Sequence, residues 1–573
     1  MIQKNEVLLK HNDKWLHFAS PHQIISVVSI DDVHAALQKI ERLVNENNWH
    51  AAGFVSYEAA PAFDSALHVL SAGDFPLLWF GLYSEPKILQ TSEVFKDLRG
   101  FVAQNWRSSI DRESYNTAIE KIKETIAQGK TYQVNFSMRL NSEFSGGEWH
   151  FFLHLAQSQN KYAAYIDTGH YVICSASPEL FFKLDGNKIY SQPMKGTTKR
   201  GRTTLEDKAQ AKWLHSSLKN RAENVMIVDM IRNDLGRIAE IGSVKVPKLF
   251  MVEKYPTLFQ MTSTVQAKTS ASVDEIFSAL FPCASITGAP KVNTMNIIAE
   301  LETTPRKVYT GSIGYISPNR QAQFNVAIRT ALIDRETKTA EYGVGSGVIW
   351  DSTSVDEYSE SLLKARVLTE RPHSFDLIET LLWTPEDGYF LRKKHSARMQ
   401  DSAEYFGYPF SSEEFEHHLE QIAEHFNSTQ RVRILLDKHG EFKTETKDFH
   451  PQEKIFKVCF AEKPVNSNDV FLFHKTTRRE MYSPIPAAFD DVLLYNENNE
   501  LTEFTIGNLV AEMDSKFFTP PISCGLLAGT FRSHLLETRE ISERVIHKDE
   551  LGKYSKLFLV NSVRKWVEVI RSN

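Results

Sequence analysis

The sequence predicts an α+β protein of two modules, a larger one at residues 1–370 followed by a smaller one at residues 374–573. Three observations lead to this prediction. A chain of 573 residues is too long for one hydrophobic core. Patterns typical of strands and of amphipathic helices are mixed along its whole length. Near residues 369–374 a helical pattern ends at a proline, and a new apolar segment with its own strands begins at residues 375–383.

The first module shows a clear order of expected elements. Glu179 lies on a strand-like segment that Pro178 interrupts. Steps of three and four place Glu223 and Asp234 on one face of a helix. The elements expected, in chain order, are a helix at 111–129, a strand at 132–140, the interrupted strand at 173–182, a helix at 218–238, glycine-containing strands over 308–350 and a helix at 356–368.

Composition and charge exclude several classes of protein. The net charge of −6 provides no basic surface for nucleic acid. The N-terminus has no apolar signal-peptide core, and no run of about 18 apolar residues occurs, so we expect a cytoplasmic protein without a membrane partner. The cysteines are too scattered for a disulfide framework or a zinc site. They are Cys174, Cys283, Cys459 and Cys524.

One lysine stands in an unusual local sequence. Lys195 follows an apparent strand at residues 188–192 and lies between Pro193 and Gly196, which indicate a turn with a sharp change of chain direction. Such a turn can hold a side chain for chemistry. A solvated loop lysine is the ordinary alternative for this motif alone.

Carboxylates recur at helical spacing in the same module. Glu223 lies on the helix at 218–238, and Glu357 and Glu360 lie on the helix at 356–368. Carboxylates from two helices suit Mg²⁺, which takes one or two of them and completes its coordination with water and substrate oxygens. A solvated helix face is the structural alternative, with Glu360 and Lys364 as an i,i+4 ion pair.

A cation and a glycine-rich strand indicate an anion pocket. Arg329 ends an apolar strand, where a guanidinium needs a carboxylate partner. Gly345 and Gly347 would let backbone N–H groups approach the same anion. Together they predict a pocket for a small acid that carries carboxylates. A protein Asp or Glu is an equal alternative as the partner of Arg329.

Six sequence blocks together resemble one enzyme family. They are PMKGT (193–197), RAENVMIVDMIRNDLG (221–236), CASITGAPK (283–291), YTGSIGY (309–315), GVGSGVIWDS (343–352) and EYSE (357–360). In this order they resemble the chorismate-utilising enzymes, which include anthranilate, aminodeoxychorismate, isochorismate and salicylate synthases. The resemblance runs from about residue 20 to 370 and implies a large α/β sandwich.

Three positions separate the members of that family. The resemblance implies that Lys195 marks aminodeoxychorismate synthases, where this amine adds to chorismate C2 and expels the C4 hydroxyl, while Glu179 protonates the departing group. Gln133 stands where isochorismate-type members have a lysine base, and Gln260 stands where anthranilate synthases have a histidine. All three positions indicate 4-amino-4-deoxychorismate as the product.

The resemblance also implies a binding set. Glu223 with Glu357 or Glu360 would hold Mg²⁺, and the sequence does not decide between the last two. Ammonia would add at C4 as Lys195 leaves C2. Because no amidotransferase nucleophile occurs in the chain, ammonia would come from solution or from a separate glutamine amidotransferase subunit. The residues expected around the substrate are Tyr309, Arg329, Thr287, Gly288, Gly345, Ser346 and Gly347.

The smaller module contains a second candidate catalytic lysine. Strand alternation over residues 469–479 would place Lys475 beside two phenylalanines, where partial desolvation lowers its pKa and favours a Schiff base. A lysine that reaches water is the equal alternative. A hairpin at 492–504 presents Glu503, and a glycine loop enters a helix at 524–536 as a candidate phosphate site or a plain helix start.

A lysine, an acid and a phosphate loop are the parts that a pyridoxal 5'-phosphate site needs. Their order resembles the fold-type IV enzymes, and the match covers about residues 374–573, including His395 and Arg398 of an H-x-x-R segment. The family comprises branched-chain and D-amino-acid aminotransferases and aminodeoxychorismate lyases. Thr380 is a possible assisting hydroxyl, and Arg564 a weaker candidate for a substrate carboxylate. The resemblance implies these cofactor contacts: Lys475, Arg398, Glu503, Asn508, Gly529, Thr530 and Phe531.

The order of the two modules favours one function. The product expected from the first is the substrate of an aminodeoxychorismate lyase, so the leading hypothesis is a bifunctional enzyme that makes 4-aminobenzoate, the folate precursor, from chorismate and ammonia. In the alternatives, the second module is an aminotransferase or a non-catalytic docking module for the glutaminase. A homodimer is expected only because fold-type IV modules commonly pair.

Overall fold

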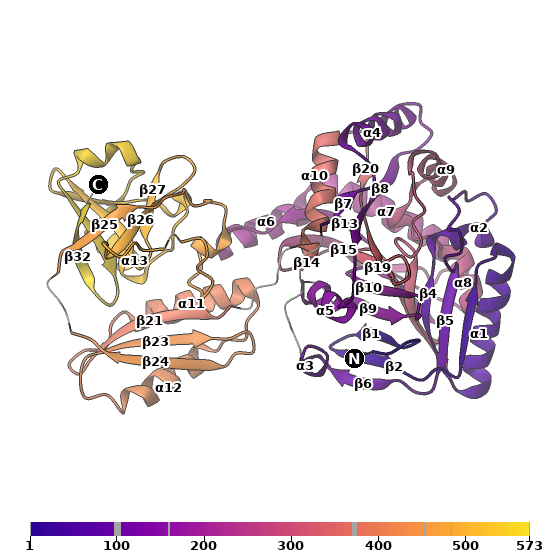
Figure 1. Cartoon of the computed structure of the whole chain (residues 1–573), viewed down its shortest axis with the longest axis horizontal. Helices are drawn as coiled ribbons and strands as arrows, with labels where there is room; N and C mark the ends of the chain where they lie inside the picture. Colours follow the sequence, from indigo (N-terminus) through magenta and orange to yellow (C-terminus); the bar gives the residue numbers. More distant parts are fainter. Residues whose placement is uncertain are drawn as a thin grey trace. The chain divides into compact units, whose positions relative to one another are not determined.

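The chain forms two compact units in the computed structural model (Figure 1). The model describes residues 2–96, 105–158, 161–369, 375–450, 454–482 and 484–571. One unit comprises Met1–Thr198 with Trp213–Pro372, and the other comprises Lys199–Lys212 with His373–Asn573. The predicted boundary at 370–374 lies outside the described residues. Within the described residues, no helix combines the length and the apolar character that crossing a membrane requires.

Two ten-stranded sheets form the centre of the first unit. The first sheet runs in the order β16 (Gly288–Ala289), β8 (Gln133–Glu143), β20 (Thr339–Val348), β19 (Thr330–Asp334), β10 (Tyr171–Ser177), β9 (Tyr162–Asp167), β1 (Val7–His11), β2 (Lys14–Phe18) and β6 (Lys87–Gln90), with β7 (Arg107–Ser108) on β8. The second runs in the order β13 (Met194–Lys199), β15 (Leu258–Lys268), β12 (Lys188–Gln192), β11 (Leu180–Asp185), β18 (Gln321–Val326), β17 (Ser312–Ser317), β4 (His50–Val55), β5 (Leu78–Tyr83) and β3 (Gln23–Val27), with β14 (Lys245–Lys254) on β15.

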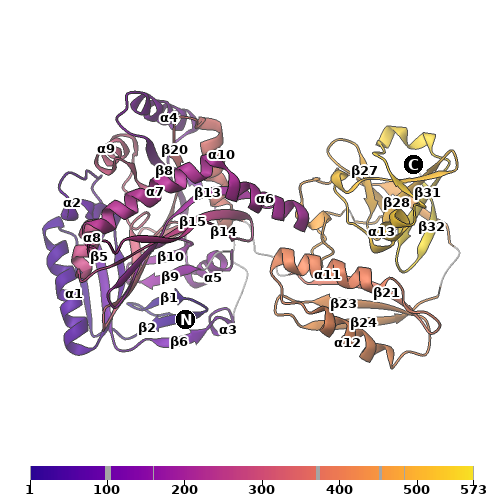
Figure 2. The ribbon, with the colours of Figure 1, turned by 180° about the vertical axis from the view of Figure 1, so that it is seen from behind.

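The two sheets pack face to face, with helices on both outer faces. Ile173 of the first sheet and Phe54 of the second belong to one buried cluster between the sheets. The second sheet packs against α1 (Val33–Asn47), α2 (Ala60–Phe63), α7 (Leu218–Gly236) and α8 (Val273–Leu280), and Figure 2 shows α7 across this sheet. The first sheet packs against α3 (Thr91–Val94), α4 (Arg112–Ala127), α5 (Glu148–Ser158), α9 (Lys291–Leu301) and α10 (Ser354–Ala365). The predicted α/β sandwich is confirmed.

Side-chain caps set the starts of the helices that matter for the site. Asp111 accepts a hydrogen bond from the Ser114 N–H at the start of α4, Ser217 caps α7 through the Asn220 N–H, and Thr353 caps α10 through the Asp356 N–H. These residue types satisfy N–H groups that the helix itself leaves free. The helices predicted at 111–129, 218–238 and 356–368 therefore begin within two residues of their expected positions.

The second unit contains two sheets. The order of the four-stranded sheet is β22 (Gly388–Tyr389), β21 (Leu377–Thr384), β23 (Gln430–Leu436) and β24 (Phe442–Asp448), and it packs against α11 (Arg392–Phe406) and α12 (Ser412–Ala423). The eight-stranded sheet runs β27 (Leu501–Phe504), β26 (Asp491–Tyr495), β25 (Phe456–Phe460), β32 (Lys565–Arg571), β31 (Lys556–Asn561), β28 (Asn508–Met513), β29 (Lys516–Thr519) and β30 (Ser542–Glu543), with α13 (Thr530–Glu537) packed on it. Because β27 also pairs with β28, this sheet closes on itself.

One short segment of the first predicted module belongs to the second unit. Lys199–Lys212 contains the start of α6 (Thr204–Ser216). The Tyr405 hydroxyl donates to the Gly201 carbonyl at 2.7 Å, and the Thr204 hydroxyl donates to the Asp401 carbonyl at 3.1 Å. The predicted module of residues 1–370 is therefore interrupted here.

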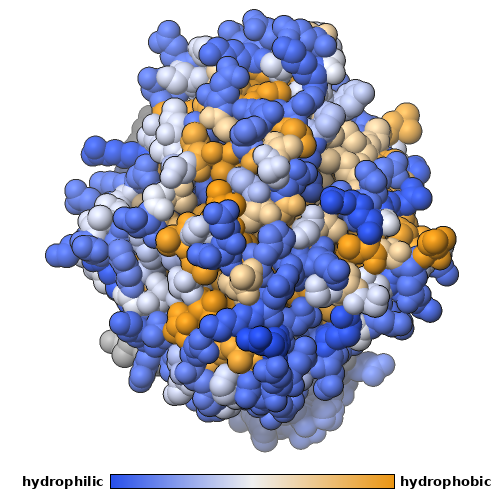
Figure 3. All heavy atoms as spheres, turned by 90° about the vertical axis from the view of Figure 1, so that its right-hand side faces the viewer, coloured by the Kyte–Doolittle hydropathy of each residue, from blue (hydrophilic) through white to orange (hydrophobic). Residues whose placement is uncertain are grey.

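The remaining features are ordinary for a folded chain. All four cysteines are free, and three of them are buried. On the face that Figure 3 shows, hydrophobic side chains form small patches separated by hydrophilic ones. Scattered apolar side chains of this kind are usual on protein surfaces.

Candidate active sites

Lys195 lies on a strand and not in the predicted turn. Pro193 separates β12 from β13, and both strands pair along β15 without a reversal of the chain. The Asn224 amide donates to the Lys195 carbonyl at 3.2 Å, and the Gln260 amide donates to the Gly196 carbonyl at 3.0 Å. Gly196 has a φ of +99°, a conformation that favours glycine. These contacts fix the backbone on both sides of the Lys195 side chain.

The Lys195 side chain enters a cavity of about 290 Å³. The cavity lies at the edges of both sheets and is lined by residues from β13, β20, α7 and α10. Most of the residues predicted from the sequence meet here. Those that line the cavity are Glu179, Lys195, Glu223, Gln260, Tyr309, Arg329, Gly345, Gly347, Glu357 and Glu360.

Glu179 has the environment of a general acid. Glu179 is 3% exposed, and burial raises the pKa of its carboxyl to about 7. Ser285, Lys195 and Arg329 act in the opposite direction, but burial outweighs them. Among the described residues its Oε1 atom has no hydrogen-bond partner. At neutral pH a large fraction of this carboxyl therefore carries a proton, and one oxygen is free for a ligand.

The same burial affects Lys195. Burial lowers the pKa of the Lys195 ammonium, and Glu223 is the strongest group that opposes the shift. Its Nζ lies so close to Gly347 that a Cβ atom at position 347 would come within 2.5 Å of it. A neutral amine is the nucleophilic form of lysine, so this environment suits an attacking group.

Arg329 has no carboxylate partner within ion-pair distance in the part of the chain that the structure describes. It lies between β18 and β19 with a φ of +52°, and burial lowers the pKa of its guanidinium. The sequence left open whether a protein carboxylate pairs with it. The structure favours a bound anion, because a buried guanidinium without a partner is costly.

Three carboxylates from two helices face the same cavity. The Glu357 carboxylate accepts a hydrogen bond from the Ser352 hydroxyl at 2.6 Å, and the Glu360 carboxylate pairs with the Lys364 Nζ at 2.8 Å. Glu223 approaches from α7. Among the described residues no three acidic, histidine or cysteine side chains gather tightly enough to hold a metal without further ligands. These carboxylates fit a Mg²⁺ site of the usual kind, in which the protein supplies one or two carboxylates and water and substrate supply the remaining ligands.

Lys475 lies in the second cavity, which has a volume of about 580 Å³. The predicted strand at 469–479 is wrong: a 3-10 helix occupies Val470–Leu472, and Lys475 follows it in an irregular segment. The Lys475 carbonyl accepts a hydrogen bond from the Ile378 N–H at 2.8 Å. Burial, reinforced by Arg398, lowers the pKa of its ammonium to about 8. The predicted desolvation is thus present, although the element is different.

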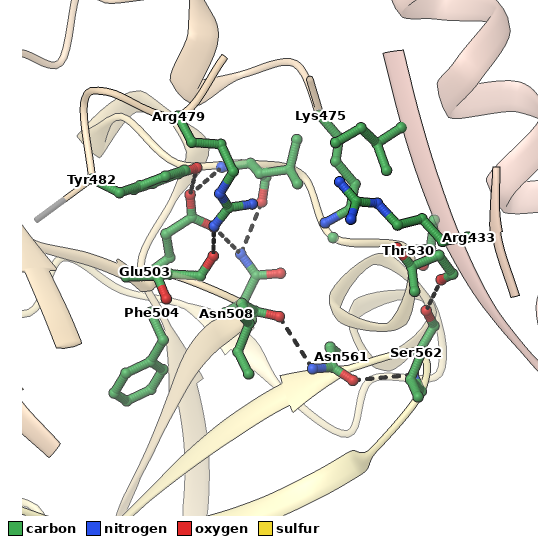
Figure 4. A pocket seen from close by; sticks show the side chains of 18 of the residues that line it. Arg433, Lys475, Arg479, Tyr482, Glu503, Phe504, Asn508, Thr530, Asn561 and Ser562 are labelled. Carbon is green, nitrogen blue, oxygen red and sulfur yellow. Dashed lines mark hydrogen bonds between the residues drawn. The ribbon is translucent and has the colours of Figure 1, made fainter. Parts of the chain in front are cut away.

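Glu503 lies across this cavity at the end of the predicted hairpin of β26 and β27 (Figure 4). It is 3% exposed, and burial raises the pKa of its carboxyl to about 8. The Tyr482 hydroxyl and the Asn508 amide each donate to it at 3.2 Å. The Leu527 N–H donates to it as well, also at 3.2 Å. A buried carboxyl held by several donors has the fixed orientation that a partner for a ring nitrogen needs.

A cradle for a phosphate lies at the other end of the same cavity. Gly529 is the N-cap of α13, Thr530 is its first residue, and both line the cavity with Arg398 of α11. Free N–H groups at a helix start and a guanidinium both favour a phosphate. Lysine, acid and phosphate cradle therefore share one cavity and fit pyridoxal 5'-phosphate.

Comparison with known proteins finds one matching family for each of the two parts of the chain. Residues 5–370 match the model of the chorismate binding enzyme family, and residues 376–571 match that of class IV aminotransferases. The chain belongs to the chorismate binding enzyme family. It carries a class IV aminotransferase domain fused behind the chorismate-binding domain.

Two relatives and one structure illustrate the likeness. Aminodeoxychorismate synthase component 1 of Escherichia coli is 39% identical over 289 residues, which are 49% of this chain and 62% of the relative. The Bacillus subtilis protein of the same name is 40% identical over 273 residues, 47% of this chain and 58% of the relative. Each match thus spans less than two thirds of the relative. Anthranilate synthase component I of Streptococcus pneumoniae shares the fold, with a TM-score of 0.55 and 24% identity over 62% of this chain and 92% of that one.

Several predicted residues do not line either cavity. Thr287 and Gly288 are buried beside β8, where the Thr287 hydroxyl bonds to the Cys283 and Ala284 carbonyls. The Ser346 residue is buried between Gly345 and Gly347, and strand alternation turns its side chain to the opposite face of β20.

In the second unit, the Phe531 ring packs in the core. Only its backbone would therefore be available to the cofactor site. Thr380 and Arg564, predicted with less support, do line the second cavity.

Sequence reasoning missed one residue that organises the phosphate cradle. Glu379 is 1% exposed and accepts from Arg398 at 2.8 and 2.7 Å and from the His395 Nδ1 at 2.5 Å. Burial acts to raise the pKa of this carboxyl, but Arg398 and His395 outweigh burial and lower it to about 2. The other ring nitrogen of His395 lies 3.2 Å from the Thr530 hydroxyl. The apolar segment at 375–383 and the adjacent Thr380 pointed to this strand, but no signal singled out Glu379.

Proposed function

We propose that the chain makes 4-aminobenzoate from chorismate and ammonia in two steps, one in each domain. The observation that carries the first step is a buried amine, Lys195, in one cavity with a carboxyl, Glu179, whose pKa of about 7 leaves it partly protonated. A nucleophile and a proton donor are the two groups that replacement of a hydroxyl requires.

The first step forms 4-amino-4-deoxychorismate. The Lys195 Nζ adds to C2 of chorismate, the ring double bond shifts, and the C4 hydroxyl leaves as water with the proton of Glu179. Ammonia then adds at C4, the double bond returns, and Lys195 leaves C2. Arg329, Tyr309 and the backbone of Gly345–Gly347 hold the enolpyruvyl carboxylate.

Glu223, with Glu357 or Glu360, would hold Mg²⁺, which would neutralise the ring carboxylate of chorismate. Glu360 is paired with Lys364, so a metal at Glu360 would compete with that ammonium for the carboxylate. The ammonia comes from a separate glutamine amidotransferase subunit or from solution.

The second step releases pyruvate and forms the aromatic ring. Pyridoxal 5'-phosphate supplies an electron sink for the carbanion when it is bound. Lys475, with its pKa near 8, removes the proton at C4 of the substrate ring and returns a proton to the departing enolpyruvyl group. Glu503 would hold the ring nitrogen of the cofactor, and Arg398, Gly529 and Thr530 would hold its phosphate.

Product analysis tests this function. Purified protein receives chorismate, ammonium, Mg²⁺ and pyridoxal phosphate, and the products are separated by liquid chromatography. We expect 4-aminobenzoate and pyruvate in equal amounts. Anthranilate as the aromatic product would contradict the first step. Aminodeoxychorismate that accumulates without pyruvate would contradict the second and favour an aminotransferase or docking role for that domain.

A further inference from the structure

The second cavity carries a large excess of positive charge. Among the described residues one acidic side chain, Glu503, lines it, and burial raises the pKa of that carboxyl to about 8. Seven basic residues line the same cavity: Arg398, Arg431, Arg433, Lys475, Arg478, Arg479 and Arg564. A cofactor phosphate neutralises only part of this charge, so the ligand that fills the rest of the cavity should itself be anionic.

Some of these cations already have partners within the chain. Arg398 is held by Glu379, and Arg478 donates to Glu480 at 3.2 Å. Arg479 donates to the Thr505 carbonyl and lies over the Tyr482 ring. These contacts leave a smaller group of guanidinium groups for a ligand.

Two of the remaining arginines lie on the same strand, β23. Arg431 and Arg433 are two residues apart, so their side chains leave the same face of the strand. On the neighbouring strand β21, Arg433 pairs in register with Thr380, which also lines the cavity. Arg433 has one ion pair, with the exposed Glu445 at 3.3 Å, and Arg431 has none among the described residues. Figure 4 shows Arg433 directed into the cavity on the side of Lys475.

Arg564 approaches the cavity from the other sheet of this unit. It lies in the turn between β31 and β32, over the rings of Phe449 and Phe456, and its guanidinium has no ion pair among the described residues. A carboxylate contact for Arg564 was already expected. The two sheets therefore present separate guanidinium groups to one cavity.

We propose that Arg431 and Arg433 bind a second carboxylate, so that the cavity selects a dicarboxylate over a monocarboxylate amino acid. This inference rests on the proposed function, because 4-amino-4-deoxychorismate carries two carboxylates. Arg564 would take one carboxylate and the β23 pair the other. A planar guanidinium binds a carboxylate through two parallel hydrogen bonds, which gives each contact directional selectivity.

Binding of an unreactive dicarboxylate tests the proposal. The probe is 3-(carboxymethoxy)benzoate, compared with benzoate, on protein loaded with pyridoxal phosphate. The visible absorbance of the cofactor reports the second cavity alone, even if the probe also enters the first. We expect Arg431→Gln and Arg433→Gln each to weaken binding of the dicarboxylate about tenfold, which corresponds to about 1.4 kcal/mol. Binding of benzoate should change less than about threefold.

Two further variants sharpen this test. Arg433→Lys should restore part of the affinity, because it keeps the charge and loses the paired geometry. Arg544→Gln, an exposed arginine that does not line the cavity, should bind both probes like wild type. Unchanged dicarboxylate affinity in both β23 variants would overturn the proposal.

Turnover separates this result from failure of the lyase step. With supplied aminodeoxychorismate, the β23 variants should show a raised KM with little change in kcat. If wild type releases no pyruvate but binds the dicarboxylate in an arginine-dependent way, the lyase function fails and the specificity proposal stands. If wild type releases pyruvate and the variants keep their KM and affinity, the lyase function stands and the specificity proposal fails.

Discussion

Lys195 and Lys475 are both buried, but the charged side chains that affect them most have opposite signs. Burial is the largest cause of the lowered pKa of both Lys195 and Lys475. For Lys195 the strongest charged neighbour is Glu223, which favours the ammonium form. For Lys475 it is Arg398, which favours the neutral amine.

The difference matches the two proposed ligands. The cavity of Lys195 contains four carboxylates and can accept a metal ion together with its substrate: Glu179, Glu223, Glu357 and Glu360. The charged residues that line the cavity of Lys475 are mainly arginines, which suit a phosphate and carboxylates. In both cavities burial lowers the pKa of the lysine, whereas the charges of the neighbouring side chains determine which ligand can bind beside it.

The largest expected effect is on the acid in the carboxylate-rich cavity. Glu179→Gln keeps the shape of the side chain and removes its proton, so aminodeoxychorismate formation should fall by about 10²- to 10⁴-fold. Because Glu179 must be protonated, the wild-type rate should decline as pH rises through about 7. The measurement holds free NH₃ constant across the pH range. A Glu179→Gln variant that keeps both rate and pH profile would contradict the role, and the exposed Glu300→Gln serves as control.

A smaller effect is expected from crowding Lys195. In Gly347→Ala the new Cβ would lie 2.5 Å from the Lys195 Nζ and 2.4 Å from the Gln133 Nε2, so the amine must move. We expect the first step to slow by more than about tenfold, since displacement of a reacting group is costly. Release of pyruvate from supplied aminodeoxychorismate should not change.

The matched control for this crowding is Gly236→Ala at the end of α7. Outside its own helix, no atom of the described residues lies within 4 Å of a Cβ at that position, so both steps should proceed at wild-type rates. Equal rates for Gly347→Ala and wild type would show that Lys195 does not need its observed position.

The smallest effect concerns the phosphate cradle of the arginine-rich cavity. Glu379→Gln removes the charge that orients Arg398 and His395, so affinity for pyridoxal phosphate should fall about tenfold, while chorismate consumption stays unchanged. Equilibrium dialysis with absorbance detection measures this affinity. Glu420→Gln removes an exposed partner of Arg392 and is the control. Wild-type cofactor affinity in Glu379→Gln would refute the positioning role.

Local sequence patterns predicted the helices better than they predicted which strands pair with each other. The helices at 111–129, 218–238 and 356–368 were predicted because caps and spacing are local signals. The segment after Pro193 looked like a turn because its pairing strand, β15, begins some sixty residues later in the chain. The match of the chain to its family confirms the fold class, while the roles of the individual site residues stay predictions.

The errors around Lys475 and Glu379 have physical reasons. Apolar alternation favoured a strand over residues 469–479, but the Asp469 carboxylate caps a 3-10 helix by accepting from the Phe471 N–H at 2.9 Å. Glu379 looked like an ordinary strand residue because its partners lie 16 and 19 residues away on α11. Thr287 and Ser346 lie within the matching blocks, yet both are buried and neither lines the cavity of Lys195.

The most direct measurement follows the intermediate in two reciprocal variants. Lys475→Ala with chorismate and ammonium should accumulate aminodeoxychorismate and form no 4-aminobenzoate. Lys195→Ala should leave chorismate unused but convert supplied aminodeoxychorismate to 4-aminobenzoate and pyruvate at the wild-type rate. This pattern would establish two separate lysine sites that act in series. Loss of both steps in either variant, or formation of aminodeoxychorismate by Lys195→Ala, would contradict the account.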